Sequence, residues 1–223
     1  MQEVELVFHM PQSWPQQDLI AVSPVMDAAT TLRAYREGVF PMPLNRREVG
    51  WFSPMRRGVM RPSQMRVSKS LRQSARKYRT SFDLAFPEVI SHCADPSRPL
   101  GWIDDRILAV YNRLHRTGVV HSVETWSKSG RLVGGLYGVS IGGLFCGESM
   151  FHDPVHGRDA SKVALLALVE RLDDGNENRL IDTQWQTPHL ASLGVVQISR
   201  DEYLGMLPEL LAAPLPHWDA RGD

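Results

Sequence analysis

Apolar residues recur along the chain with two spacings, one of three to four residues and one of two. The longer spacing, with Ser, Thr or Asp at the start and glycine at the end, predicts helices. We expect them over residues 27–37, 68–77, 87–94, 106–116, 161–172 and 187–193 and after Ser199. The clearest is 106–116, which has one continuous apolar face and ends at Gly118.

Apolar runs bounded by turn sequences predict strands over residues 81–86, 119–126, 132–141, 144–151, 179–185 and 195–198. The turns Lys128-Ser129-Gly130 and Gly142-Gly143 join the three longest runs as hairpins. Residues 39–60 are dense in proline, glycine and aromatic side chains, so loops and short strands are expected there. Residues 1–25 are interrupted by prolines and are expected to be irregular.

An antiparallel meander followed by helix, strand, helix and strand is the order of the acyltransferase fold of N-acetyltransferases (GNAT). We therefore predict an α/β (α+β) protein. A small N-terminal domain, residues 1–62, would precede a GNAT-like domain, residues 63–223, with a mixed, largely antiparallel sheet. The length of 223 residues allows one large domain or two unequal ones.

Composition narrows the class of protein. The chain is 43% hydrophobic and 22% charged, which is typical of a globular protein and not of a disordered one. No run approaches the roughly 20 apolar residues of a membrane span, and the acidic first ten residues do not resemble a signal peptide. Cys93 and Cys146 are too few for a disulfide framework. We expect a cytoplasmic protein with free thiols and no membrane partner.

Positive charge is concentrated in one part of the chain. Between Arg33 and Arg79 there are eleven arginines and two lysines against two glutamates, which leaves twelve basic and 23 acidic residues elsewhere. Guanidinium groups suit phosphate, so this block indicates a nucleic acid bound at one edge of the molecule. The alternative is a solvated basic face.

Two polar features interrupt apolar strands. Glu148 lies within LFCGESMF, where a carboxylate is either paired structurally or presented to a cationic ligand. Asp182, Gln184 and Gln186 alternate along IDTQWQ (181–186), so a regular strand would place all three on one face. That face is either a site or the wet side of an edge strand.

Other candidate motifs match known catalytic or metal-binding patterns poorly. Ser149 lies two residues after Gly147, as in a nucleophile elbow, but the closing glycine of that motif is absent. Cys146 lies in an apolar run and is expected to be buried. The histidines and aspartates of residues 152–159 match no standard ligand spacing, so we predict a solvated loop and no metal site.

Whole segments of the sequence resemble the leucyl/phenylalanyl-tRNA–protein transferase family. They are YREGVFPMP (35–43), WFSP (51–54), WI (102–103), AVYNRLHRTGVVHSVETW (109–126), GLYGVSIGGLFCGESMF (135–151), ASK (160–162), ALL (164–166), LIDTQ (180–184) and HLASLG (189–194). The resemblance covers roughly residues 32–205. It implies transfer of Leu, Phe or Met from aminoacyl-tRNA to proteins that begin with Arg or Lys, which creates a degradation signal. It implies no cofactor and direct aminolysis of the ester.

The resemblance also assigns roles to residues. Gln184 would orient the amine or the ester carbonyl, Asp182 would support Gln184, and Glu148 would help to place the acceptor. An apolar pocket for the aminoacyl side chain would be lined by Leu136, Met150, Leu165, Leu168, Leu172 and Ile181. Trp102 would stack on the terminal adenine. Phosphates of the tRNA acceptor stem would be contacted by Arg66, Lys69, Arg72, Arg76 and Lys77.

The sequence departs from the family at a few positions. Met42 stands where the family has a tryptophan after Phe-Pro, which removes an aromatic wall near the adenosine. Leu168 and Leu172 stand where the family often has phenylalanine, so the pocket is expected to be wider. Two other functions remain open: an acetyl-CoA-dependent N-acetyltransferase, and a catalytically inactive RNA-binding module. The former is disfavoured because no glycine-rich turn leads into a helix. We expect the chain to act as a monomer.

Overall fold

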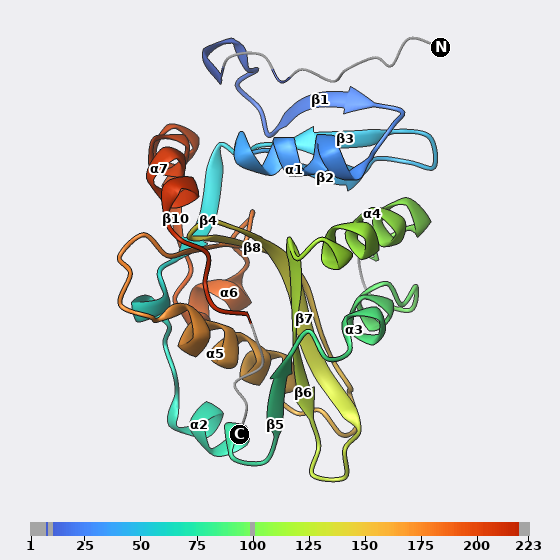
Figure 1. Ribbon diagram of the computed structural model, residues 1–223, viewed down its shortest axis with the longest axis vertical. Coiled ribbons are helices and arrows are strands. Elements are labelled where there is room, and N and C mark those ends of the chain that lie inside the picture. Colours follow the sequence, from blue (N-terminus) through green and yellow to red (C-terminus); the bar gives the residue numbers. More distant parts are fainter. Residues whose placement is uncertain (1–7, 9–10, 99–100, 219–223) are drawn as a thin grey trace.

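The computed structural model describes residue 8, residues 11–98 and residues 101–218 (Figure 1). Its α-helices are Ala28–Arg36 (α1), Lys69–Ala75 (α2), Phe86–Cys93 (α3), Asp105–Arg116 (α4), Ala160–Leu172 (α5), Pro188–Leu193 (α6) and Arg200–Ala212 (α7). Its strands are Leu19–Ser23 (β1), Phe40–Pro43 (β2), Val49–Phe52 (β3), Arg56–Met60 (β4), Arg79–Phe82 (β5), Val120–Trp126 (β6), Leu132–Ile141 (β7), Leu144–His152 (β8), Leu180–Asp182 (β9) and Val196–Ser199 (β10). Short 3-10 helices lie at Pro11–Ser13 and Pro62–Gln64.

The helix starts follow the predicted caps. The side chains of Asp27, Ser68, Thr187 and Ser199 each accept a hydrogen bond from a backbone N–H in the first turn of α1, α2, α6 and α7. These bonds satisfy N–H groups that have no partner within the helix. None of the helices within the described residues is long and apolar enough to cross a membrane.

A small antiparallel sheet in the order β1-β3-β2 lies beside α1. Trp51 of β3 is fully buried in its apolar cluster and donates its indole N–H to the Ser23 hydroxyl. The expectation that residues 1–25 are irregular is wrong at β1. The prolines on either side of β1 argue against a strand, but β1 forms because it pairs with β3.

The large sheet has the order β10-β4-β9-β8-β7-β6-β5. Its strands pair antiparallel except β8 with β9, which are parallel. Helix α5 packs on one face, and α3 and α4 cover the other (Figure 1). A separate apolar cluster fills each face. The predicted mixed α/β class with a small N-terminal domain is confirmed, whereas the similarity to N-acetyltransferases stays a prediction.

The change from one sheet to the other occurs between Phe52 and Arg56. Strand β4 lies before the predicted boundary at residue 62, yet it pairs with β9 and β10 of the large sheet. Pairing between strands that are distant in the sequence has no local sequence signal. A proline such as Pro62 does have one, and it indicated a boundary at the wrong end of β4.

Two predicted strands are shorter than their patterns. Strand β9 ends at Asp182 because Gln184 adopts a left-handed backbone, with φ of 58°. Strand β5 ends at Phe82, before Asp83 with φ of 57°. The Asp83 carboxylate then accepts the backbone N–H of Ser122 at 2.9 Å, which turns the chain toward α3.

Candidate active site

Glu148 lies at an irregularity in the pairing of β7 with β8. Tyr137 lies opposite Ser149, but the next pair is Gly138 opposite Gly147, so Glu148 has no partner in the ladder. This extra residue makes a β-bulge, a device that redirects side chains at the edges of sites. The bulge also shifts the alternation of side chains along β8, so residues after it face the opposite side from that expected of a regular strand. Phe145 and Met150, five residues apart, both belong to the cluster on the α5 face.

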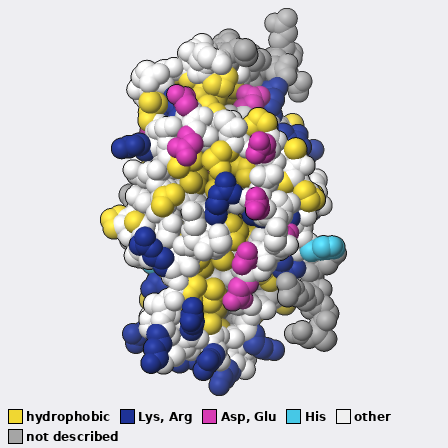
Figure 2. All heavy atoms as spheres, turned by 90° about the vertical axis from the view of Figure 1, so that its left-hand side faces the viewer, with side chains coloured by type: hydrophobic (Ala, Val, Ile, Leu, Met, Phe, Trp, Pro, Cys, Tyr) yellow, Lys and Arg dark blue, Asp and Glu magenta, His cyan; other side chains and the backbone are white. Residues whose placement is uncertain are grey.

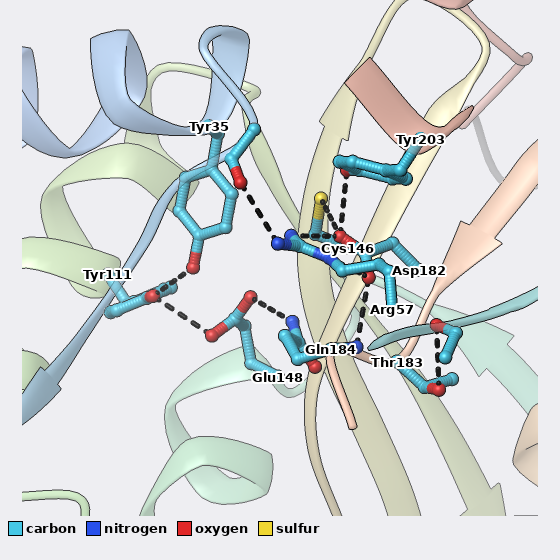
Figure 3. A network of polar contacts seen from close by, with 11 residues as sticks. Tyr35, Arg57, Tyr111, Cys146, Glu148, Asp182, Thr183, Gln184 and Tyr203 are labelled. Carbon is cyan, nitrogen blue, oxygen red and sulfur yellow. Dashed lines mark hydrogen bonds and ion pairs between the residues drawn. The ribbon is translucent and has the colours of Figure 1, made fainter. Parts of the chain in front are cut away.

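The Glu148 carboxylate is held by two side chains from distant elements (Figure 3). Tyr111 of α4 donates its hydroxyl to Oε2 at 3.0 Å, and the Gln184 amide Nε2 donates to Oε1 at 3.2 Å. The hydroxyls of Tyr111 and Tyr35 are 2.5 Å apart, so α1 also contributes to the network. Burial raises the pKa of Tyr111 well above its ordinary value, and its hydroxyl therefore stays protonated as a donor.

The environment of Glu148 changes its acidity. Burial of the carboxyl group raises its pKa from 4.5 to about 7, although hydrogen bonds from Tyr35 and Tyr111 act in the opposite direction. A group that titrates near neutral pH can exist in both protonation states under ordinary conditions. Glu148 is therefore suited to accept a proton or to bind a cation.

Gln184 is aimed at Glu148 by the way β9 ends. The pairing of β8 with β9 stops at Cys146 opposite Asp182, and beyond that point the side chain of Gln184 reaches across to Glu148. The backbone N–H of Gln184 donates to Asp182 Oδ1 at 2.9 Å, and its carbonyl accepts from Gly58 at 2.8 Å. A Cβ at Gly58 would lie 2.8 Å from the backbone nitrogen of Gln186, so only glycine permits this approach.

Asp182 is part of a buried ion pair. Arg57 of β4 donates Nε to Oδ1 at 2.9 Å and Nη2 to Oδ2 at 2.6 Å. Tyr203 of α7 also donates to Oδ2, at 2.9 Å. Burial alone would lower the pKa of Arg57, but the Asp182 carboxylate outweighs it and the pKa is raised. Asp182 thus fixes the backbone of Gln184 and is itself fully engaged.

The sequence pattern does not mark Arg57, Tyr35 and Tyr111 as residues of the site. Arg57 was counted in the basic block assigned to nucleic acid, but its side chain is only 1% exposed. The two tyrosines were taken as members of apolar helix faces. The alternation of Asp182, Gln184 and Gln186 was misleading, because Gln186 donates to the Val195 carbonyl at 2.6 Å and takes no part in the network.

Comparison with known proteins identifies the family. The family model described as "Leucyl/phenylalanyl-tRNA protein transferase" matches residues 59–208, and the model of its N-terminal domain matches residues 26–55. The chain belongs to this family. A relative from Syntrophobacter fumaroxidans named leucyl/phenylalanyl-tRNA–protein transferase is 43% identical over 92% of this chain and 88% of its own length. Proteins of the same name from Chromobacterium violaceum and Legionella pneumophila (strain Corby) are 44% and 41% identical, over 90% and 97% of this chain and 87% and 95% of their own.

The six aliphatic residues that the family resemblance assigns to a pocket lie together. Leu136, Leu165, Leu168, Leu172 and Ile181 are buried in the cluster between the sheet and α5. Met150 is only partly buried and packs against this cluster, two residues from Glu148. The other two predicted substrate residues, Met42 and Trp102, are partly buried against the cluster on the opposite face.

The predicted phosphate-binding residues gather around α2. Arg66, Lys69, Arg72, Arg76 and Lys77 are all exposed. Figure 2 shows Lys and Arg side chains concentrated at the lower end of the molecule, where α2 lies in Figure 1. Acidic side chains are sparse at that end of the face shown. The basic residues around α2 therefore lie on the surface, whereas Arg57 of the same basic block is buried.

The loop of residues 152–159 and the two cysteines have structural roles. Within the described residues no group of three His, Cys, Asp or Glu side chains is arranged to hold a metal ion. Asp153 accepts backbone N–H groups of Val155 and His156 and pairs with Arg131. Both thiols are buried, and burial raises the pKa of Cys93 to about 11, which disfavours a reactive thiolate.

Proposed function

We propose that this chain transfers Leu, Phe or Met from the 3′ end of aminoacyl-tRNA to the α-amino group of proteins that begin with Arg or Lys, which marks them for degradation. Membership of the leucyl/phenylalanyl-tRNA–protein transferase family supports the reaction class. The observation that carries the proposal at the level of residues is the hydrogen bond between Gln184 and Glu148 where β8 and β9 stop pairing.

The proposed reaction is the aminolysis of an activated ester. The acceptor nitrogen forms a bond with the aminoacyl carbonyl carbon, the ester C–O bond breaks, and the tRNA hydroxyl leaves with a proton. An α-amino group has a pKa of about 7.7–8.0, so part of it is neutral near pH 7. Correct placement of two such reactants can supply up to about 7–11 kcal/mol of the barrier. Positioning is therefore the main task of the site.

Gln184 has the geometry for that task. Its amide nitrogen donates to Glu148, which leaves the amide oxygen to accept a hydrogen bond from the incoming amine. The Asp182 carboxylate and the Gly58 N–H hold the backbone of Gln184 on both sides. A rigid glutamine can therefore direct the lone pair of the amine toward the ester.

Glu148 is proposed to bind the acceptor amine and to take its proton. In the ionised form it attracts the α-ammonium group, and with a pKa of about 7 it can accept the proton that this group gives up. Arg57 already neutralises Asp182, so Glu148 is the carboxylate of this network without a cationic partner among the described residues.

The donor is proposed to bind through surfaces on both faces of the sheet. The aminoacyl side chain enters the cluster of Leu136, Met150, Leu165, Leu168, Leu172 and Ile181. Trp102 stacks on the terminal adenine with Met42 nearby, and the basic residues around α2 contact the acceptor-stem phosphates. We propose that the chain does this as a monomer in the cytoplasm, where aminoacyl-tRNA is made, without a cofactor.

A peptide-labelling experiment tests this function. The chain is incubated with radiolabelled leucyl-tRNA and one peptide in four forms: starting with Arg, Lys or Ala, or starting with Arg and acetylated at its α-amine. Label on the Arg and Lys forms alone supports the proposal. Retention of tRNA without labelling of any peptide would indicate an RNA-binding module. Acetylation of the peptides in a parallel incubation with acetyl-coenzyme A would indicate an N-acetyltransferase. Either of these outcomes contradicts the proposal.

A further inference from the structure

A short segment after helix α7 packs against the α5 face of the sheet. Residues 214–218, which we call the C-terminal strap, follow α7 and end against the α5 face of the sheet. The strap lies beyond residue 208, where the match to the family model ends.

Two buried arginines hold the strap by its backbone. Arg179 donates Nη1 to the Pro214 carbonyl at 2.5 Å, and Arg171 of α5 donates to the His217 carbonyl at 2.8 Å. Pro216 between them is buried. Arg179 and Arg171 are only 3% and 8% exposed, and their guanidinium groups form strong charge-assisted bonds, so the strap is a fixed part of the fold.

Trp218 at the end of the strap is held on three sides. Its ring stacks on His121 of β6, with centroids 4.1 Å apart and planes at 8°. Its indole N–H donates to the Ser140 hydroxyl of β7 at 3.2 Å. The ring also lies against Phe145 of β8, with centroids 5.6 Å apart.

Phe145 links Trp218 to the aliphatic cluster. Its side chain is fully buried, and it lies opposite Ile181 on the neighbouring strand. Phe145 belongs to the same cluster as Leu136 and the leucines of α5, and Trp218 packs against that cluster. On the solvent side the cluster is bordered by Met150, two residues from Glu148. At the side covered by the strap, the cluster therefore ends at Phe145, which is supported by Trp218.

We propose that Trp218 is a specificity-determining residue that acts through Phe145. It prevents Phe145 from moving away and so limits how far an aminoacyl side chain can extend into the cluster. This inference rests on the proposed function. Protein interiors are close-packed, so Phe145 limits the length of the side chain that fits if it cannot move. Removal of the indole allows Phe145 to move toward the strap and lengthens the pocket.

The test compares two donors with one acceptor peptide. For the wild type and for Trp218→Ala, kcat/KM is measured with leucyl-tRNA and with phenylalanyl-tRNA. The Phe-to-Leu ratio of kcat/KM is expected to rise about tenfold in Trp218→Ala, in line with the discrimination of about 10–200-fold that small differences in pocket size give. Trp218→Phe, which keeps an aromatic ring, is expected to shift the ratio in the same direction by less.

Trp126→Ala is the matched control. Trp126 is also partly buried and also donates its indole N–H to a serine, Ser81, but it packs against the cluster on the other face. The ratio is expected to stay at the wild-type value in this variant. Equal losses with both donors in Trp218→Ala, or an unchanged ratio in both Trp218 variants, would overturn the inference. Failure of the wild type to label any peptide would instead overturn the proposed function.

Discussion

Arg57 binds both carboxylate oxygens of Asp182, and the two side chains are 1% and 0% exposed. The same guanidinium donates to the Gly38 carbonyl at 2.9 Å, just after α1. The pair thus connects the N-terminal part of the chain to the strand that carries Gln184. Asp182 also accepts from Tyr203 and from the Gln184 backbone, so we propose that it supports Gln184 and does not act as a base.

Removal of Arg57 is expected to destabilise the fold. Arg57→Met leaves a buried carboxylate without its cation, and the free energy of unfolding is expected to fall by about 3–5 kcal/mol. Urea unfolding measures this loss. The double variant Arg57→Met/Asp182→Asn is expected to be more stable than Arg57→Met alone, because no buried charge remains. A Met substitution at the exposed Arg113 is the control. Equal stability of the Arg57 and Arg113 variants would show that the pair is unimportant.

Glu148 makes stability depend on pH. Its pKa is raised by burial from 4.5 to about 7, so the folded state binds the proton more tightly than the unfolded state. This contribution is complete below about pH 4.5 and is lost as the pH rises to about 7. Glu148→Gln abolishes the titration, so its stability relative to the wild type is expected to increase across that window and to level off above it. Urea unfolding at several pH values measures the difference, and a constant difference would contradict the assigned environment.

The basic surface around α2 has a test in the salt dependence of binding. Lys69→Glu/Arg72→Glu is expected to weaken tRNA binding and to reduce the slope of log K against log salt concentration by about two, one for each lost phosphate contact. Arg113→Glu/Arg116→Glu on α4, also exposed, is the matched control. An unchanged slope in the α2 variant would exclude these residues from the tRNA interface.

The features that the sequence predicted well are those that depend on near neighbours. The caps at Ser68 and Ser199 and the hairpins that join β6, β7 and β8 each act within a few residues, and the structure confirms them. The residues that the family resemblance assigns to the aminoacyl pocket do lie together under α5, but their role in substrate binding stays a prediction.

The missed features depend on contacts between distant parts of the chain. Arg57 and Asp182 are 125 residues apart, and no local pattern distinguishes Arg57 from the exposed arginines near it. Strand β1 exists only through its pairing with β3. The bulge at Glu148 and the left-handed backbone of Gln184 break the alternation on which strand prediction relies. Both departures lie in the site itself, where function commonly overrides local regularity.

Gln184 is proposed to position the amine and not to hold the tRNA. The most direct test measures single-turnover labelling of an Arg-starting peptide and the Kd for leucyl-tRNA in the wild type, Gln184→Ala and the control Gln186→Ala. Gln184→Ala is expected to slow transfer about 100-fold with the Kd nearly unchanged, the loss typical of misplaced reactants, whereas Gln186→Ala should transfer at close to the wild-type rate. A Gln184→Ala variant that transfers as fast as the wild type, or one whose slower transfer is fully explained by weaker tRNA binding, would contradict the account.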